Sequence, residues 1–386
     1  MYVTEESGAM IPVYLDYNAT TPIDAEVADA MLPFLRDHYG NPSSLYDYGR
    51  TAREAVDRAR TQVADLLHCS PREVIFTSGG TESNNFAIKG TARANRDRGN
   101  HIITSRIEHP AVEECFRYLE QQGFEASYIS VDDTGRVDVD ELRNAIRPDT
   151  ILISVMHANN EVGTIEPLEE IAAIAKDSGI ILHTDAAQSV GKIPTDVEQL
   201  GVDLLSVAGH KVYAPKGIGA LYAREGTVLE KFMHGAGHED NMRAGTENVL
   251  EIVGLGKACE IARRDLTHNM AHMRAMRDRL HEGLVEAGYD VRLNGHPDER
   301  LPNTLSIGFN GMEAQTLLSR MDGVFASTGS ACHEGSPTVS GVLAAMRVPR
   351  AYARGTLRLS TGRLTTKEEI DTVLAAIEPA FTPHST

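Results

Sequence analysis

Residues 179–189 read Gly-Ile-Ile-Leu-His-Thr-Asp-Ala-Ala-Gln-Ser, and residues 202–211 read Val-Asp-Leu-Leu-Ser-Val-Ala-Gly-His-Lys. Each stretch begins with a short apolar run that is typical of a buried strand. The first run leads to the carboxylate of Asp185, and the second leads to the amine of Lys211. Because ligands of α/β sheets bind beyond the carboxyl ends of the strands, these two groups are candidates for one site.

A carboxylate and a lysine at two strand ends predict a pyridoxal 5'-phosphate (PLP) site. A lysine can hold the PLP aldehyde as a Schiff base, and a carboxylate can keep the pyridine nitrogen protonated so that the ring accepts electrons. Gln188 lies three positions after Asp185, where its amide can reach the phenolic oxygen. Ala208 and Gly209 allow close backbone approach beside Lys211. Taken singly, each residue could also be a helix-capping aspartate or a surface lysine.

The surrounding chain alternates strand-like and helix-like segments. Seven β-branched apolar runs fall at 74–77, 101–104, 126–129, 150–155, 180–183, 204–207 and 219–223. Helical patterns fall between them at 82–96, 111–122, 139–146 and 168–178. This alternation predicts an α/β fold with a mostly parallel, seven-stranded sheet that is covered by helices on both faces.

A smaller α+β domain is expected after this sheet. A long charged helical pattern spans about 249–287, and fewer strand patterns follow it. We expect a large domain over residues 15–260 and a small domain formed by residues 1–14 and 261–386. Residues 1–10 resemble a loose tail.

Composition argues against several classes of function. The 386 residues include 37 basic and 55 acidic side chains, a formal charge of −18, which opposes direct binding to nucleic acid or to an anionic membrane. No apolar stretch approaches the roughly 20 residues of a membrane span, and no signal peptide is recognisable. Cys69, Cys115, Cys259 and Cys332 form no CxxC pair, so we expect no metal site and a reduced, cytoplasmic protein.

Other polar residues near predicted strand ends complete a candidate site. Residues 77–82, Thr-Ser-Gly-Gly-Thr-Glu, place Gly80 and Thr81 at a helix N-terminus, where backbone N–H groups bind phosphate. His109 follows the next strand and can stack on a pyridine ring, although a structural loop histidine is the alternative. Asn160 follows another strand, and its amide can bond a substrate carboxylate or the cofactor oxygen.

Two residues of the second domain carry further chemistry. Cys332 lies in the Gly/Ser-rich stretch 327–336, which is typical of a mobile loop, and an exposed cysteine there can form a thiolate. The other three cysteines are expected to be buried. Arg358 stands alone in an apolar strand pattern, and a substrate carboxylate could satisfy it bidentately, as could a structural salt bridge.

With these motifs the chain resembles the cysteine desulfurases of the class V aminotransferase group, among the fold-type I PLP enzymes. The likeness covers nearly everything from Tyr14 to the last helix, with matching stretches at 14–22, 40–44, 77–84, 108–109, 156–163, 183–189, 209–211, 242–246, 329–332 and 358–363. The stretch after Cys332 is similar to the subgroup with a long catalytic loop, which serves iron–sulfur assembly and tRNA thiolation.

The resemblance implies conversion of L-cysteine to L-alanine, with the sulfur held as a persulfide on Cys332. It implies catalytic roles for Cys332, Lys211 and His109. The implied cofactor contacts are Lys211, Asp185, Gln188, His109, Gly80, Thr81, His210, Asn160 and, from a partner subunit, Thr246. The implied contacts to the substrate carboxylate are Asn160, Arg358 and Asn41.

The resemblance also implies partners, namely a homodimer with shared active sites and a sulfur-acceptor protein. Direct nucleic-acid or membrane contact is not expected. Iron–sulfur assembly, tRNA thiolation and DNA phosphorothioation all stay open as destinations of the sulfur.

Two departures from the family pattern stand out. Ala208 occupies a position where the family usually has a serine that contacts phosphate, which predicts weaker PLP retention. His333 and Glu334 replace the more usual Thr-Ser after Cys332 and are slightly similar to selenocysteine lyases. A selenocysteine lyase or another PLP-dependent lyase is therefore the alternative enzyme, and a non-catalytic scaffold is the alternative of another class.

Overall fold

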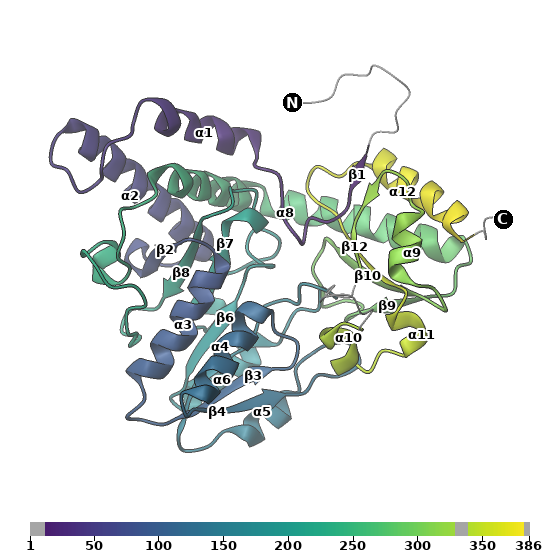
Figure 1. The fold of residues 1–386 in the computed structure, drawn as a ribbon, viewed down its shortest axis with the longest axis horizontal. Coiled ribbons are helices and arrows are strands. Elements are labelled where there is room, and N and C mark those ends of the chain that lie inside the picture. Colours follow the sequence, from purple (N-terminus) through teal and green to yellow (C-terminus); the bar gives the residue numbers. More distant parts are fainter. Residues whose placement is uncertain (1–11, 329–338, 382–386) are drawn as a thin grey trace.

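The computed structural model describes residues 12–328 and 339–381. Its larger sheet has the strand order β2-β8-β7-β6-β5-β3-β4 (Figure 1). The strands are β2 (Val74–Thr77), β3 (His101–Ser105), β4 (Glu125–Ile129), β5 (Thr150–Ser154), β6 (Ile181–Asp185), β7 (Leu204–Ala208) and β8 (Gly219–Ala223). The pairs from β4 to β7 are parallel, and β8 runs antiparallel to both of its neighbours, β7 and β2. The predicted mostly parallel, seven-stranded sheet is confirmed.

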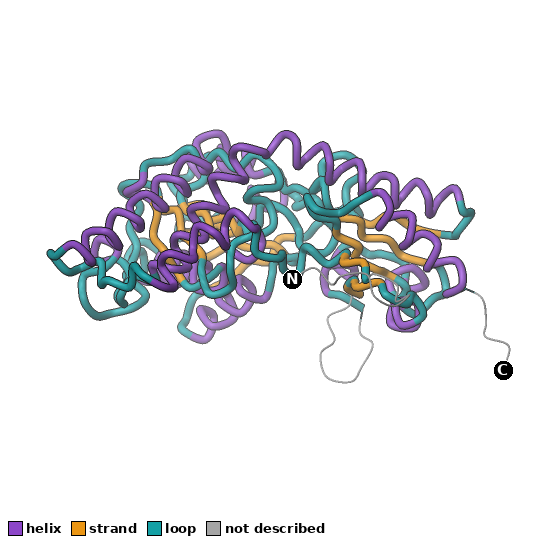
Figure 2. The backbone as a smooth tube through the Cα atoms, turned by 90° about the horizontal axis from the view of Figure 1, so that it is seen from above, coloured by secondary structure: helices purple, strands orange, loops and turns teal. Residues whose placement is uncertain are grey.

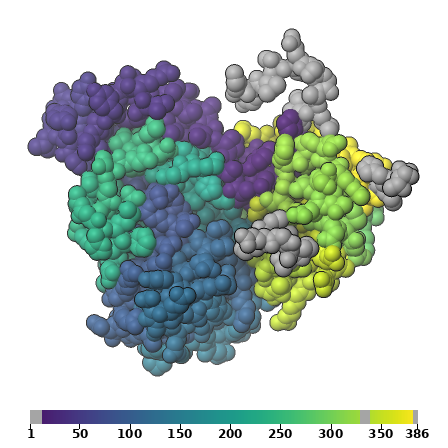
Figure 3. Space-filling model, viewed as in Figure 1, coloured from purple at the N-terminus to yellow at the C-terminus, as the bar shows by residue number. Residues whose placement is uncertain are grey.

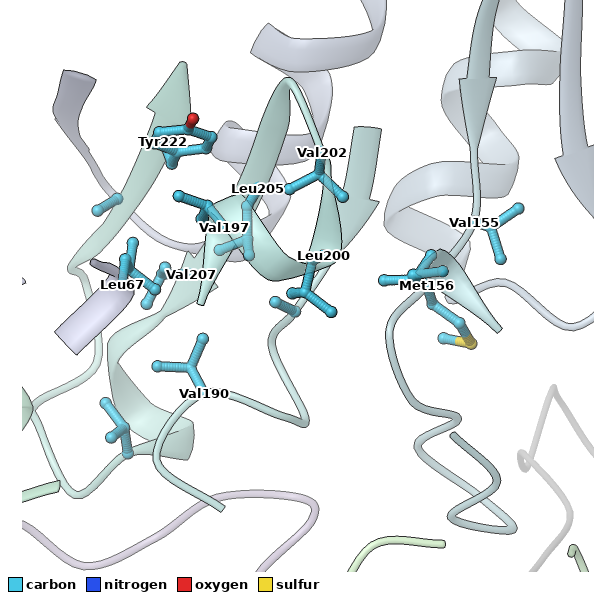
Figure 4. Packing of buried hydrophobic residues seen from close by; sticks show 14 of the residues in the cluster. Leu67, Val155, Met156, Val190, Val197, Leu200, Val202, Leu205, Val207 and Tyr222 are labelled. Atoms are coloured by element: carbon cyan, nitrogen blue, oxygen red, sulfur yellow. The ribbon is translucent and has the colours of Figure 1, made fainter. Parts of the chain in front are cut away.

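Helices cover both faces of this sheet. The covering helices include α3 (Gly80–Ala94), α4 (Pro110–Gln121), α5 (Val139–Ala145), α6 (Leu168–Asp177) and α7 (Val197–Leu200). Successive strand residues point to opposite faces, so Ile102 packs in one apolar cluster with Phe116 of α4, whereas Ile103 packs in another with Ile171 of α6. The central strands are buried on both sides for this reason. Figure 4 shows part of the second cluster, where Val197 and Leu200 lie near Leu205.

Three further helices flank the sheet, and the first two of them, α1 and α2, were not predicted. The three helices are α1 (Ala25–Arg36), α2 (Asp47–Leu67) and α8 (Val249–Glu286). A Cβ on Gly256 of α8 would lie 2.5 Å from the Cα atom of Ala59 in α2, so glycine allows these two helices to pack closely. Figure 1 shows α8 running from α2 to the second sheet.

The second sheet is small and antiparallel, with the order β12-β13-β10-β9. Its strands are β9 (Val291–Asn294), β10 (Thr304–Phe309), β12 (Ser327–Thr328) and β13 (Thr356–Ser360), and a separate parallel pair joins β1 (Val13–Tyr14) to β11 (Val324–Phe325). The helices beside them are α9 (Ala314–Ser319), α10 (Gly341–Ala345), α11 (Arg350–Ala353) and α12 (Lys367–Ala380). Figure 2 shows the two groups of strands side by side along the molecule.

The N-terminal segment packs with this second group of elements. Val13 and Leu15 share an apolar cluster with Leu280 of α8 and with β10, β13 and α12. Helix α8 passes through residue 260 without interruption, and the domain division at that point stays a prediction. Within the two described ranges, no helix has the length and apolar character needed to cross a bilayer.

Candidate active site

A pocket of about 160 Å³ lies at the carboxyl ends of the parallel strands. Its walls come from the end of β6, the turn after β7, the first turn of α3 and the loop after β5. Eight of the predicted site residues line it, namely Gly80, Thr81, His109, Asn160, Asp185, Gln188, His210 and Lys211. The strand ends therefore lie together at one edge of the sheet, as predicted.

Asp185 is the last residue of β6 and is 6% exposed. Its Oδ1 accepts a hydrogen bond from the backbone N–H of Ala187 at 2.9 Å, and its Oδ2 accepts one from Nδ2 of Asn84 at 2.7 Å. The two donors hold the carboxylate at the pocket wall. Asn84 was missed as a site residue, although it lies within the 77–84 stretch of the family pattern.

Lys211 ends a short 3₁₀ turn, Gly209–Lys211, directly after β7. A Cβ on Gly209 would lie 2.8 Å from the side chain of Ile218, which explains the need for glycine before the lysine. The Lys211 Nζ donates to the backbone carbonyl of Ala19 at 2.8 Å and also to that of Asn18. Burial lowers the pKa of Lys211 to about 8, and the positive charge of Arg358 adds to this effect. The amine is thereby a better nucleophile and base at neutral pH than an ordinary lysine.

Two histidines border the amine. His109 is the N-cap residue of α4, and its Nδ1 accepts from the backbone N–H of Ala111 at 3.1 Å, so the neutral ring carries its proton on Nε2. The pKa of His109 is lowered, mainly because burial disfavours the charged ring. The charge of Asp185 opposes this effect, and the charge of Lys211 adds to it. The His210 ring contacts Oγ1 of Thr20 at 3.2 Å, and burial lowers its pKa to about 4. Near neutral pH the His210 ring is thus uncharged.

The first turn of α3 borders the pocket at the place where the sequence predicts anion binding. Helix N-termini leave backbone N–H groups without intrahelical partners, and here this turn borders the pocket at Gly80 and Thr81. A Cβ on Gly80 would lie 3.1 Å from the Cβ of Ala208, so Ala208 stands directly beside the turn. An ion pair supports the turn, since Arg243 donates to the Glu82 carboxylate at 2.8 and 3.1 Å.

Gln188 is oriented by its neighbours rather than by a helix. The sequence suggested one helical turn after Asp185, but residues 187–192 form turns. Gln188 Nε2 donates to the backbone carbonyl of Asn18 at 3.0 Å, and its Oε1 accepts from Nζ of Lys192 at 2.9 Å. Neither Asn18 nor Lys192 was predicted. Asn18 lies within the 14–22 stretch of the family pattern, which was the available signal.

These side chains fit PLP. Asp185 could pair with the pyridine nitrogen, and the N-terminus of α3 could bind the phosphate. Lys211 offers an amine with a lowered pKa to the aldehyde. His109 borders the space for the ring, and Gln188 has an N–H group to offer the phenolic oxygen.

Arg358 lies in β13 beside the loop that carries Asn160. Its Nη2 donates to Oδ1 of Asp16 at 2.7 Å and to Oγ of Ser327 at 3.0 Å. Its Nη1 donates to the backbone carbonyl of Asn160 at 3.2 Å. The alternative of a structural salt bridge is therefore realised with Asp16, while a role toward a substrate carboxylate stays a prediction.

Two predicted residues, Asn41 and Thr246, do not line this pocket. Asn41 is exposed on the loop between α1 and α2, where its Oδ1 accepts from the backbone N–H of Ser43 at 2.9 Å. Thr246 is exposed in the segment before α8. Cys332 lies outside the described residues. The roles of all three stay predictions.

The segment leading to Thr246 contains an unusual turn. Residues 239–241, Glu-Asp-Asn, all have positive φ angles, between 48° and 66°. Non-glycine residues in this region cost about 1–3 kcal/mol each unless their surroundings hold them. Here the buried Glu239 carboxylate accepts two hydrogen bonds from Arg60, at 2.7 and 2.8 Å. This pair anchors the turn.

The other cysteines are poor thiolate candidates. Cys115 and Cys259 are buried as expected, and burial raises their pKa values to about 11 and 12. Cys69 is only partly buried, against expectation, yet desolvation raises its pKa to about 12. Across the described part of the chain, no three His, Cys, Asp or Glu side chains gather as a metal ion requires.

Comparisons with known proteins agree over almost the full length. The class-V aminotransferase family model matches residues 13–373. The cysteine desulfurase IscS of Methanosarcina thermophila is 51% identical over 367 residues, which are 95% of this chain and 91% of that protein. A solved NifS-like protein is similar with a TM-score of 0.90 at 40% identity, covering 96% of this chain and 99% of its own. The structure of SspA in complex with cysteine gives 0.81 and 36%, covering 92% and 100%. The matched residues run from β1 into α12.

Proposed function

This chain belongs to the class-V aminotransferase family, and we propose that it is a PLP-dependent cysteine desulfurase that converts L-cysteine to L-alanine and captures the sulfur on Cys332. One observation carries the proposal. Lys211, Asp185 and the first turn of α3 border one pocket in a chain that is 51% identical to a cysteine desulfurase.

The pocket residues have two proposed roles: some would bind the cofactor, and Lys211 would move a proton. When bound, PLP supplies an electron sink for the pair released at the substrate Cα. Asp185 would hold the ring nitrogen, and Gly80, Thr81 and His210 would hold the phosphate. Lys211 would take the proton from the substrate Cα, which its lowered pKa of about 8 favours.

Substrate recognition is proposed for the part of the pocket that Asn160 lines, where the backbone carbonyl of Asn160 accepts from Arg358. Arg358 and Asn160 would bind the substrate carboxylate, with Asn41 a further candidate. Arg358 already pairs with Asp16 at 2.7 Å, so the substrate would share a guanidinium that is held in place. A planar guanidinium held by one carboxylate still offers donors to a second.

Sulfur transfer is proposed to proceed through a persulfide. The Cys332 thiolate would attack the sulfur of cysteine, forming an S–S bond as the Cβ–S bond breaks. The electron pair of the broken bond stays with the carbon fragment, which takes up protons and leaves as alanine. A covalent sulfur carrier avoids the release of free sulfide.

A homodimer is proposed as the working unit, with Thr246 reaching the phosphate site of the partner. The α1–α2 end of the molecule projects from the body in Figure 3 and exposes Leu35, Tyr39, Leu45 and Tyr46. Exposed apolar side chains gathered in one region are typical of an interface. A cytoplasmic location and a sulfur-acceptor protein are further parts of the proposal. The charge of −18 suggests that any nucleic acid is reached through that acceptor.

Mass spectrometry after addition of L-cysteine tests the proposal. We expect one additional sulfur atom on Cys332, with alanine formed in parallel. The Cys332→Ser variant should bind PLP with an unchanged absorbance and lose alanine formation, whereas the control Cys69→Ser should keep both. Full activity of Cys332→Ser would remove Cys332 from the reaction.

A selenocysteine lyase is the second candidate, favoured by His333-Glu334 after Cys332. Turnover of L-cysteine and L-selenocysteine, with and without Cys332, separates the two enzymes. A lyase would act on selenocysteine much faster than on cysteine and would keep that activity without Cys332.

A further inference from the structure

A buried lysine lies behind the pocket and has no role in the chemistry above. Lys192 is 4% exposed, in the turns that follow β6. Its Nζ donates to Oε1 of Gln188 at 2.9 Å and to Oδ1 of Asn18 at 3.3 Å. Within the described ranges it forms no ion pair, and such burial is costly for a charged amine.

The surroundings of Lys192 suit a neutral amine. A neutral amine has two N–H groups, and two amide oxygens accept them here. Burial lowers the pKa of Lys192 well below its usual value, and the nearby positive charges of Lys211 and Arg358 act in the same direction. The side chain is therefore a donor fixed in place rather than a counter-ion.

This donor determines which way the Gln188 amide points. With Oε1 bound to Lys192, the Nε2 end must face away, where one N–H reaches the backbone carbonyl of Asn18 at 3.0 Å. The other N–H remains for the pocket that Gln188 lines. A reversed amide would place an oxygen toward any anionic ligand atom at that wall.

Lys192 also holds Asn18, whose backbone carbonyl accepts from Lys211 and from Gln188. The Asn18 Oδ1 accepts from Lys192 and from Nδ2 of Asn303 at 2.9 Å, and its own Nδ2 donates to Oγ1 of Thr304 at 2.8 Å. Every polar atom of this amide is thus engaged, and Asn18 has one orientation.

We propose that Lys192 is a positioning residue that fixes the Gln188 amide with an N–H group toward the phenolic oxygen of PLP. It does not line the pocket, so it acts through Gln188. The inference rests on the proposed function, because PLP is the ligand that Gln188 would serve.

The proton affinity of the bound cofactor provides the test. In the holoenzyme, the pH at which the PLP absorbance changes reports how well the phenolic oxygen is stabilised as an anion. Without Lys192 the Gln188 amide is free to turn its N–H away, and losing that N–H should make the phenolic oxygen more basic. Lys192→Met should therefore shift the midpoint upward by about one to two pH units, the effect of one hydrogen bond to a charged group.

A double-mutant comparison shows whether the effect passes through Gln188. In a Gln188→Leu background, Lys192→Met should cause no additional shift. The control Lys176→Met, on the exposed surface of α6, should titrate like the wild type. An unshifted Lys192→Met midpoint would overturn the proposal, as would an equal shift with and without Gln188.

A crystal structure of the wild-type holoenzyme tests the role of Lys192 without any variant. Lys192 Nζ should remain within hydrogen-bonding distance of Gln188 Oε1, with the other end of the amide facing the cofactor. A Lys192 turned away from Gln188 would refute the inference. A wild-type chain that stays colourless after PLP is added would instead refute the proposed function.

Discussion

Nδ2 of Asn84 lies 2.7 Å from Oδ2 of Asp185, and this contact joins the helix that borders the proposed phosphate site to the strand that carries the proposed partner of the ring nitrogen. Asn84 is 1% exposed, and its Oδ1 has no partner within the described ranges. The two ends of the proposed cofactor site are thereby linked by one amide.

Removing this amide should weaken catalysis. A hydrogen bond to a charged group contributes about 1.5–3 kcal/mol, so Asn84→Leu should lower kcat/KM for L-cysteine by about 10- to 100-fold. Asn85→Ala is the matched control, since among the described residues the Asn85 amide bonds only the backbone carbonyl of Thr81. Steady-state alanine formation measures both variants, and equal losses in the two would contradict the role of Asn84.

Much of this site was predictable because it lies at strand ends. Asp185 and Lys211 each follow a buried apolar run, and a parallel sheet brings such ends to one edge. Gly80 and His109 follow the same logic, since each begins a helix just after a strand. Local sequence was sufficient to place these four residues at one pocket.

The remainder of the site depends on contacts between distant parts of the chain. Asn18 reaches Lys192, Asn303 and Lys211 only after the N-terminal segment has packed between the two sheets. No local periodicity reports such packing. The positive φ angles of residues 239–241 were equally unpredictable, because Glu239 in that turn pairs with Arg60 of α2, which is distant in sequence.

A hydroxyl added beside the proposed phosphate site should strengthen cofactor binding. Ala208 lines the pocket, and Gly80 has no Cβ to obstruct an added hydroxyl. Ala208→Ser should therefore slow the loss of PLP on dialysis by about tenfold or more, as expected for one hydrogen bond to a charged acceptor. Absorbance during dialysis measures the rate, with Ala223→Ser on β8 as the control. An unchanged rate would reject the missing contact.

The lowered pKa of Lys211 should govern how fast the apoenzyme takes up PLP. Only the neutral amine attacks the aldehyde. With a pKa of about 8, the rate should rise about tenfold per pH unit below pH 8 and level off above it. Stopped-flow absorbance between pH 6 and about 10 follows this rate. A rate that still climbs steeply at pH 10 would indicate an ordinary lysine.

The buried carboxyl group of Glu108 should make the fold less stable as the pH rises. Its Oε1 accepts from Oγ of Ser105 at 2.6 Å and from the backbone N–H of Met156 at 3.0 Å, whereas its Oε2 has no partner within the described ranges. Burial raises the pKa of Glu108 to about 8, and the charge of Asp185 acts in the same direction. In the unfolded chain the group ionises near pH 4.5, so its stabilising effect is complete below that pH and is lost as the pH rises to 8.

Glu108→Gln keeps the shape of the protonated group and removes its ionisation. Relative to the wild type, its free energy of unfolding should be similar near pH 5 and higher at pH 8 by as much as about 4 kcal/mol, since each pH unit is worth about 1.4 kcal/mol. Urea unfolding of the apoenzyme at both pH values measures this difference. Glu169→Gln, on the exposed surface of α6, should show no such trend. If Glu108→Gln has the same advantage at pH 5 as at pH 8, the native Glu108 is not protonated across this range, and the burial of Oε2 must be relieved by another group.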